Sequence, residues 1–349
     1  MNESHARALE FSDHVRLAAS FWTNKMSIYL TNESISFLDY INKSKARPIT
    51  ELTPPEAREQ SNAFDSWVVG DRKVPEGVSI QDSVVPVQGG SSVRVRTFVP
   101  RDNSTRALLV YFHGGGWVLH SAFSPNYTVV CAHMANEGKF SIVSVDYHLA
   151  PEHKFPAAVD DSVGCTEWLL HSSENRASIG LPADIQTIGV GGDSAGGNLA
   201  AVTAQELKRK GIDELKFQVL IYPATDLRAK FPSHTKFADG FSLTRAKIEW
   251  FLLHYLTSED DKENPRASPL LGKNLSGLPP CLIISGDCDP LVDESVEYGK
   301  KLAEAGTSVQ CVVEKGLPHG YFGYLRFFAN AAAASHKLVV QFIQEHLTV

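Results

Sequence analysis

Residues 191–197 read Gly-Gly-Asp-Ser-Ala-Gly-Gly, and the fold can be worked out from this stretch. The apolar run 185–190 precedes it and an alanine-rich segment, 197–210, follows it, so the sequence predicts a strand, a sharp turn and a helix. In that context G-x-S-x-G is a nucleophile elbow, whose strained turn points the hydroxyl of Ser194 out of the sheet. The helix would bring its N-terminus and the Ala195 amide close to developing negative charge. A glycine-rich turn with a capping serine would give the same letters, but the strand and helix on either side favour the elbow.

Outward from this turn, strand-like apolar runs alternate with helix-like stretches. The predicted strands are 84–87, 93–99, 107–112, 140–145, 185–190, 217–222, 281–285 and 309–313. The predicted helices are 127–137, 157–171, 197–210, 292–305 and 331–346, the last with Asn330 as its cap. Such alternation predicts an α/β fold with a mostly parallel central sheet of about eight strands, flanked by helices on both faces.

Two segments depart from the alternation and predict a helical cap. Residues 1–66 have mostly apolar side chains at near-helical spacing, namely His14, Val15, Leu17, Ala18, Phe21 and Trp22, then Ile35, Leu38 and Ile41. Residues 228–266 form an aromatic-rich helical insertion between two strands. We therefore expect 1–66 to be the N-terminal part of a cap, 67–227 and 267–349 to be the core, and 228–266 to be a cap insertion.

The predicted strand 107–112 is followed by His113-Gly114-Gly115-Gly116. Three successive glycines leave backbone N–H groups unshielded, so that they can approach a substrate. The pattern matches the H-G-G-G loop that supplies oxyanion-hole donors in lipases and esterases. A flexible turn would explain the glycines alone, but not their place upstream of an elbow.

The partners of Ser194 should come from the last two strands. His319 follows the final strand through a loop that contains Gly316 and Pro318, which suits a side chain that must reach Ser194. Thirteen histidines make any arbitrary choice unsafe, and this position is what distinguishes His319. For the acid, Asp287, Asp289 and Asp293 compete; Asp293 is better placed to begin the next helix.

Several motifs together resemble the hormone-sensitive lipase family, which includes microbial esterases and arylacetamide deacetylases. They are H-G-G-G at 113–116, D-Y-H-L-A-P-E at 146–152, F-P-A-A at 155–158, G-G-D-S-A-G-G at 191–197, D-P-L-V-D-E at 289–294 and H-G at 319–320. The resemblance implies an α/β-hydrolase fold and assigns Asp289 as the acid, with Asp287 as the alternative. His148 stands where the family usually has arginine. That arginine looks structural, so a catalytic role for His148 is the less favoured interpretation.

The resemblance implies a serine carboxylesterase that acts on short to medium acyl esters. Ser194 would attack, His319 would take its proton and Asp289 would orient the imidazole. Gly115, Gly116 and Ala195 would donate to the oxyanion and Gly114 would shape their loop, without a metal or organic cofactor. Amide deacetylation uses the same groups and stays open. A ligand receptor of this fold is a weaker alternative, because such receptors lack the triad histidine.

Aromatic and apolar residues near the motifs are candidates for the substrate pocket, although each could equally be core. They are Trp117, Tyr222, Phe241, Leu243 and Phe322. The expected partner is a small-molecule ester. A net charge of -7 argues against nucleic acid. Five scattered cysteines suit a reducing compartment, and neither a signal peptide nor a membrane span is evident, so we expect a cytoplasmic protein, with a homodimer left possible.

Overall fold

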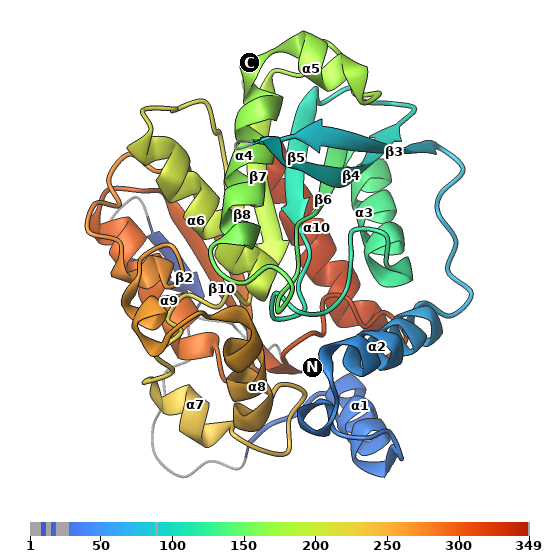
Figure 1. Cartoon of the computed structure of the whole chain (residues 1–349), viewed down its shortest axis with the longest axis vertical. Helices are drawn as coiled ribbons and strands as arrows, with labels where there is room; N and C mark the ends of the chain where they lie inside the picture. The colour runs from blue at the N-terminus through green and yellow to red at the C-terminus, as the bar shows by residue number, and fades with distance from the viewer. Residues whose placement is uncertain (1–7, 12–14, 19–27, 88–89, 348–349) are drawn as a thin grey trace, which may run out of the picture.

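The computed structural model describes residues 8–11, 15–18, 28–87 and 90–347 and contains one large sheet (Figure 1). Eight strands lie in the order β10-β9-β8-β7-β5-β6-β4-β3, and β2 and β1 extend the sheet beyond β10. Strands β5 to β10 pair in parallel, whereas β4 and β3 are antiparallel. The eight are β3 (Val78–Pro86), β4 (Ser92–Pro100), β5 (Ala107–Phe112), β6 (Ser141–Asp146), β7 (Thr187–Asp193), β8 (Gln218–Ile221), β9 (Cys281–Cys288) and β10 (Val309–Pro318). The predicted α/β-hydrolase fold is confirmed.

Helices cover both faces of the sheet, as Figure 1 shows. They are α3 (Pro125–Gly138), α4 (Ala157–His171), α5 (Ser173–Ser178), α6 (Ala195–Arg209), α9 (Val292–Glu304) and α10 (Ala329–Glu345). Strand β5 explains the two layers, because its side chains point alternately to opposite faces. Leu108, Val110 and Phe112 join the hydrophobic cluster that includes residues of α4, α6 and α9. Leu109 and Tyr111 join the cluster that includes residues of α3 and α10.

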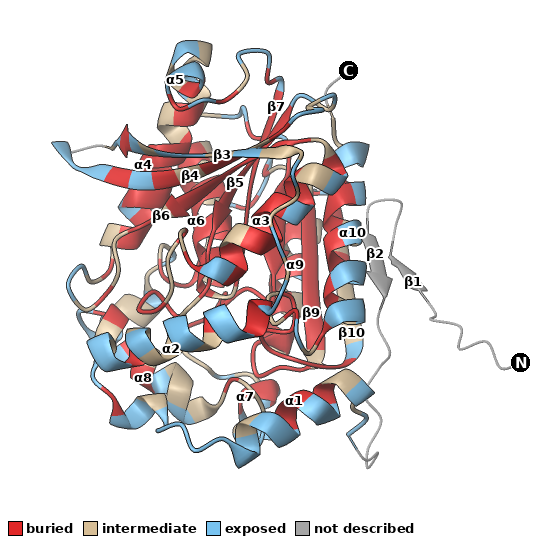
Figure 2. Cartoon of the chain, turned by 90° about the vertical axis from the view of Figure 1, so that its right-hand side faces the viewer, coloured by how far each residue is buried: buried red, intermediate tan, exposed pale blue. Residues whose placement is uncertain are grey.

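A further group of helices gathers at one end of the molecule, as both views show (Figures 1 and 2). The group comprises α1 (Asn32–Lys43), α2 (Pro54–Val69), α7 (Pro232–Lys236) and α8 (Arg245–Tyr255), with short 3-10 turns at Ile49–Glu51, Glu259–Glu263 and Pro269–Leu271. Local sequence fixes the ends of α2: Thr53 and Glu56 form a capping box, and Gly70 ends the helix at φ 62°. Among the described residues, no helix is long and apolar enough to span a membrane.

Two expectations about helices were wrong. Val15, Leu17 and Ala18 lie in a strand, β2 (Val15–Ala18), which pairs in parallel with β10 and antiparallel with β1 (Ala8–Phe11). The open edge of β10 offers backbone hydrogen bonds, and these override the weak helical spacing of so short a segment. His14, Phe21 and Trp22 lie outside the described residues, whereas Ile35, Leu38 and Ile41 do lie in α1.

Asn330 does not cap the last helix either, because α10 begins at Ala329. The carboxylate of Glu33, on α1, instead accepts hydrogen bonds from the amides of Asn330 and Ala331, at 2.9 and 3.2 Å. A side chain from a distant helix thus satisfies two amides that the helix leaves free at its N-terminus.

Parallel pairing brings the functional motifs to one edge of the sheet. His113 follows β5, Ser194 follows β7, Asp289 follows β9 and His319 follows β10. Since the carboxyl ends of parallel strands share one edge, four motifs that are far apart in sequence lie around one point.

His336 makes the stability of the fold depend on pH. Burial lowers the pKa of this histidine from 6.5 to about 4, and its Nε2 donates to the carbonyl of Phe322. A lowered pKa favours the neutral form in the folded state, so its stabilising effect is complete above pH 6.5 and is lost as the pH falls toward 4. Between pH 7 and pH 5 we expect this residue alone to cost about 2 kcal/mol of unfolding free energy.

Urea denaturation at several pH values checks this, with His336→Gln as the comparison, because glutamine can keep the donor but does not titrate. The variant should lose less stability on acidification than the natural protein. Equal losses in the two proteins would contradict the assignment.

Candidate active site

Ser194 occupies the sharp turn between β7 and α6. Its φ is 56°, in a region that only glycine enters without strain, and its amide donates to the carbonyl of Ile221 at 2.8 Å. Neighbouring backbone leaves no room at the flanking glycines, since a Cβ on Gly192 or Gly196 would overlap the carbonyl oxygen of Phe112. The turn is therefore the strained elbow that the sequence predicts.

Ser194, His319 and Asp289 form one hydrogen-bonded chain. The Nε2 of His319 lies 2.9 Å from the Oγ of Ser194, and its Nδ1 lies 2.6 Å from the Oδ2 of Asp289. Because a carboxylate can only accept, Nδ1 carries the proton and Nε2 can accept the serine proton. Asp289 is fully buried, and its second oxygen accepts from the amide of Leu291 at 2.9 Å.

The other two acid candidates have different partners. The Oδ1 of Asp287 accepts from the amide of Gly316, at 2.6 Å, and from the thiol of Cys288. Asp293 lies in the first turn of α9 and accepts from the amide of Ser233 at 2.8 Å. Of the three aspartates, only Asp289 is placed to orient His319.

In the glycine loop after β5, one glycine bonds to the surrounding protein and the next two line the cavity. The N–H of Gly114 donates to the hydroxyl of Tyr127, at 2.8 Å, and to the Oδ1 of Asp193, at 3.1 Å. Gly114 therefore supports the loop itself, which is the role expected of it from the sequence. Gly115 and Gly116 have φ of 110° and 59° and, like Ala195 at the first position of α6, line the cavity.

Asp193 anchors this loop from within the elbow itself. Its carboxylate accepts from the hydroxyls of Tyr111, at 2.9 Å, and Tyr127, at 3.0 Å, as well as from Gly114. Burial raises the pKa of Asp193, and the two tyrosine hydrogen bonds act against that rise. The side chain next to the nucleophile thus ties the elbow to the glycine loop.

His113 and His148, the two other histidines within the motifs, have structural partners. Burial lowers the pKa of His113 to about 4, so the ring is neutral at pH 7; it stacks on Tyr147 at 4.3 Å, and its Nδ1 donates to the carbonyl of Gly114. His148 hydrogen-bonds through Nδ1 to Asp161 at 2.7 Å and does not line the cavity.

Above the three residues lies a cavity of about 630 Å³. Trp117, Tyr222 and Leu243 line it, as expected. Phe241 and Phe322 do not, which corrects those two assignments: the ring of Phe241 packs edge-on against Phe237, and that of Phe322 against His336. Phe322 is a buried core residue, whereas Phe241 is half-buried and packs against the edge of the core.

Sequence reasoning missed most of the cavity wall that the helices contribute. The lining includes Phe37 and Tyr40 from α1, Phe64 and Trp67 from α2, and Ile248 and Phe251 from α8. Phe251 lies directly on the glycine loop, where a Cβ on Gly116 would overlap its ring. The aromatic content of the two helical segments was the only signal for these contacts.

A second buried pair, Asp65 with His120, was also missed. Asp65, on α2, lies 2.7 Å from the Nδ1 of His120, whose backbone has a φ of 67°. Burial lowers the pKa of His120, but the Asp65 carboxylate outweighs this effect and the pKa is raised. No group of three or more metal-ligating side chains is found within the described part of the chain.

Comparison with known proteins identifies similar chains. A family model described as alpha/beta hydrolase fold, Abhydrolase_3, matches residues 109–323. An ethyl acetate hydrolase of Pseudomonas putida is 33% identical over 87% of this chain and 93% of its own length. Carboxylesterase NlhH of Mycobacterium tuberculosis is 38% identical over 86% of this chain and 88% of its own length. The crystal structure of a thermostable Pseudomonas putida esterase superposes with a TM-score of 0.84, at 30% identity, over 93% of this chain and all of that one.

The hydroxyl of Tyr127 should matter for catalysis because it holds both the glycine loop and Asp193. Tyr127→Phe keeps the ring and removes these hydrogen bonds, so we expect kcat on a p-nitrophenyl ester to fall about tenfold, less than the 10² to 10³ lost with a direct oxyanion donor. KM should change little. Tyr298→Phe is the matched control, because it also removes one buried tyrosine hydroxyl. Tyr298 lies on α9, and its hydroxyl accepts a hydrogen bond from the side chain of Gln205. Equal kcat in the two variants would show that the loop does not need Tyr127.

Proposed function

The chain belongs to the Abhydrolase_3 family of the α/β-hydrolase fold, and from this premise we propose that it is a serine carboxylesterase in which Ser194, His319 and Asp289 hydrolyse small esters. The membership confirms the resemblance to the hormone-sensitive lipase family. The observation that carries the proposal is the hydrogen-bonded chain from Asp289 through His319 to Ser194, at a strained turn that faces a cavity. The relatives compared above are named as ester hydrolases, which favours esters over amides as substrates.

The proposed acylation step uses each contact of the site. The Oγ of Ser194 attacks the ester carbonyl carbon while the Nε2 of His319 takes the hydroxyl proton. Asp289 stabilises the imidazolium and does not take the proton itself. The amides of Gly115, Gly116 and Ala195 donate to the oxyanion of the tetrahedral intermediate. When the intermediate collapses, His319 returns the proton to the departing alcohol and the acyl group stays on Ser194.

Deacylation repeats the same transfers with water in place of the serine. His319 takes a proton from the water as its oxygen attacks the acyl carbon, and the second tetrahedral intermediate forms in the same oxyanion hole. Its collapse releases the carboxylic acid and restores the Ser194 hydroxyl. The residues named are sufficient for both steps, so we propose no metal or organic cofactor.

The helices at the carboxyl edge of the sheet support the proposed cap. Helices α1 and α2, and α8 in the insertion 228–266, each contribute side chains to the cavity lining. We assign α1, α2 and 228–266 to the cap. The core then includes β1 and β2, which lie within the expected cap segment 1–66 but extend the central sheet. The five cysteines are all free and buried, which agrees with the expected reducing, cytoplasmic environment. The homodimer stays a prediction.

Replacing the proposed acid tests the triad. Asp289→Asn should lower kcat about 10⁴-fold, because the amide lets the imidazole adopt the wrong tautomer while leaving the geometry intact. Asp287→Asn is the matched control, since it removes a charge two residues away whose partners are Gly316 and Cys288. If Asp287→Asn proved the more damaging change, the acid would be Asp287.

The cavity predicts a graded preference for acyl chain length. Each buried CH₂ contributes about 0.8 kcal/mol, so kcat/KM should rise with chain length until the cavity is filled and then fall. We expect the maximum for acyl chains of roughly two to eight carbons, with steps limited to about 1–3 kcal/mol per methylene. A panel of p-nitrophenyl esters measures this. A maximum on emulsified C16 or C18 triglycerides would instead indicate a lipase.

A further inference from the structure

The buried pair of Asp65 and His120 connects the cap to the glycine loop. The Oδ2 of Asp65, on α2, lies 2.7 Å from the Nδ1 of His120, and the hydroxyl of Ser61, one turn earlier on the same helix, lies 3.4 Å from that nitrogen. Because a carboxylate can only accept, Nδ1 carries a proton. The side chains of Asp65 and His120 are 0% and 11% exposed, and His120 lines the cavity that contains Ser194. The proposed reaction uses neither residue.

The imidazole of His120 packs against Gly115, one of the proposed oxyanion donors. A Cβ at Gly115 would lie 2.6 Å from the Cδ2 of His120, closer than side chains approach one another. The carbonyl of Gly115 accepts from the amides of Val118, at 3.1 Å, and Leu119, at 2.9 Å, so residues 115–119 form a tight turn. The ring therefore lies against the backbone whose amide would contact the oxyanion.

The backbone of His120 is held in a strained conformation. Its φ of 67° lies in the left-handed region, which a residue other than glycine occupies stably only when neighbouring contacts compensate. The ring has two such contacts, because Nδ1 meets Asp65 and an edge faces the ring of Tyr127, with centroids 5.7 Å apart. Tyr127 in turn holds the amide of Gly114. Side chains of α2 and α3 thus hold the glycine loop together.

Asp65 needs His120 as much as His120 needs Asp65. The Oδ1 of Asp65 is buried and has no hydrogen bond within the described ranges, so the imidazole is the one donor to this carboxylate there. A buried charge needs such a donor, since it has lost the hydrogen bonds that water would provide. Burial lowers the pKa of His120, but the carboxylate outweighs burial, so the pKa is raised and the charged imidazole is favoured.

We propose that Asp65 and His120 are positioning residues for the oxyanion hole, through which helix α2 of the cap fixes the amide of Gly115. The inference rests on the proposed esterase function. The pair acts through Gly115 and takes no part in proton transfer. An amide that is fixed before the reaction stabilises the oxyanion better than one that must reorganise. The cap therefore contributes to kcat as well as to the binding of substrate.

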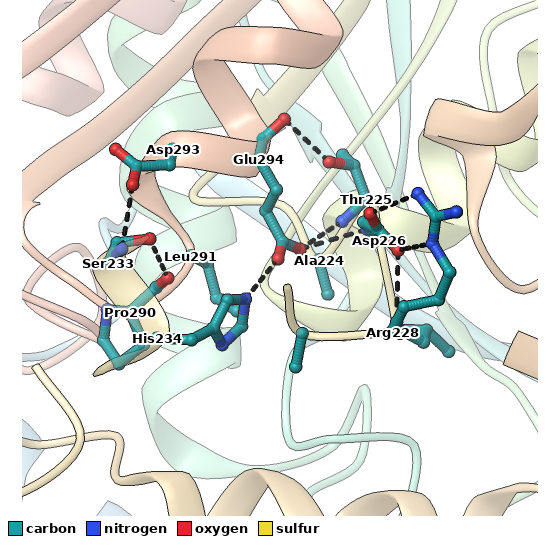
Figure 3. A network of polar contacts seen from close by, with 12 residues as sticks. Ala224, Thr225, Asp226, Arg228, Ser233, His234, Pro290, Leu291, Asp293 and Glu294 are labelled. Carbon is teal, nitrogen blue, oxygen red and sulfur yellow. Dashed lines mark hydrogen bonds and ion pairs between the residues drawn. The ribbon is translucent and has the colours of Figure 1, made fainter. Parts of the chain in front are cut away.

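Two other histidine–carboxylate pairs have the same hydrogen-bond distance in different surroundings. Figure 3 shows His234, on α7, whose Nε2 lies 2.7 Å from Glu294, on α9. The Nδ1 of His148 lies 2.7 Å from Asp161, on α4. Of the three rings, that of His120 is the one that packs against the glycine loop. Its place beside an oxyanion donor, and not the distance alone, therefore sets this pair apart.

Asp161→Ala is a strict control for the loss of a buried carboxylate. Asp161 accepts from both the amide and the ring of His148, at 2.8 and 2.7 Å, whereas Asp65 accepts from one ring nitrogen. Deleting the Asp161 carboxylate therefore breaks one hydrogen bond more. Since His148 does not line the cavity, this loss should not reach the oxyanion hole.

Steady-state kinetics on a p-nitrophenyl ester test the proposal. Asp65→Ala removes the acid from α2 and is compared with Asp161→Ala. His120→Gly removes the imidazole, whereas His120→Asn replaces it with an amide that can still donate to Asp65. Glycine and asparagine both tolerate a positive φ, so backbone strain does not separate these two variants. End-point labelling with a fluorophosphonate counts the active enzyme, so that unfolded protein does not enter kcat.

Asp65→Ala and His120→Gly should each lower kcat about tenfold with little change in KM, a smaller loss than that of a direct oxyanion donor. Asp161→Ala should keep the natural kcat, and His120→Asn should keep most of it. Unchanged kcat in Asp65→Ala and His120→Gly, or an equal loss in Asp161→Ala, would overturn the proposal while hydrolysis by the natural protein still upheld the esterase. A natural protein without hydrolytic activity would overturn both.

A transition-state analogue gives a second measurement, which a purely structural role of the pair would not change. When a trifluoromethyl alkyl ketone binds, the Oγ of Ser194 bonds to its carbonyl carbon, His319 takes the hydroxyl proton and the carbonyl oxygen becomes an oxyanion. In His120→Gly the inhibition constant of this ketone should rise by about the factor by which kcat falls. Inhibition by the methyl ketone of the same length, which binds without forming the oxyanion, should stay the same. Equal changes for the two ketones would contradict the proposal.

Discussion

The left-handed backbone at Ser194 is the constraint around which the rest of the structure is arranged. A non-glycine residue at φ 56° is strained. The conformation persists because the carbonyl of Phe112 packs closely against the glycines on either side of Ser194, and because the Ser194 amide donates a hydrogen bond to Ile221. These contacts come from β5, β7 and β8, so the elbow exists only when the sheet is complete. The strain serves function, because it turns the Ser194 hydroxyl away from the backbone and toward His319.

Buried carboxylates then organise the surroundings of the elbow. Asp289 orients His319, Asp193 ties the elbow to the glycine loop, Asp65 holds His120 beside that loop, and Glu294 holds His234. Burying a charge is unfavourable unless hydrogen bonds compensate, and each of these groups has donors from a different element. Asp65 on α2 and His234 on α7 link the helical end of the molecule to the loops and helix that follow the strands, so the cavity wall and the reacting groups are positioned by one set of polar contacts.

Much of the fold could be predicted from the sequence, because its signals are local. The apolar run 107–112 and the stretch 157–171 coincide with β5 and α4, and the elbow needs its glycines at fixed positions. Position after the last strand was enough to select His319. The predictions that failed concern residues whose structure is decided by contacts with parts of the chain that are distant in sequence. The edge of β10 made a strand of Val15–Ala18, and Glu33 took the capping role expected of Asn330. Phe241 and Phe322 pack against Phe237 and His336 instead of lining the cavity.

Covalent labelling of Ser194 is the most direct measurement of the central claim, namely that the buried Asp289–His319 pair activates this one hydroxyl. Treatment with a fluorophosphonate, followed by intact-mass analysis and peptide mapping, should give one adduct per chain, on Ser194. His319→Gln should suppress the reaction, because serine is a weak nucleophile without its base. No adduct, or one on another residue while esterase activity disappears, would contradict the account.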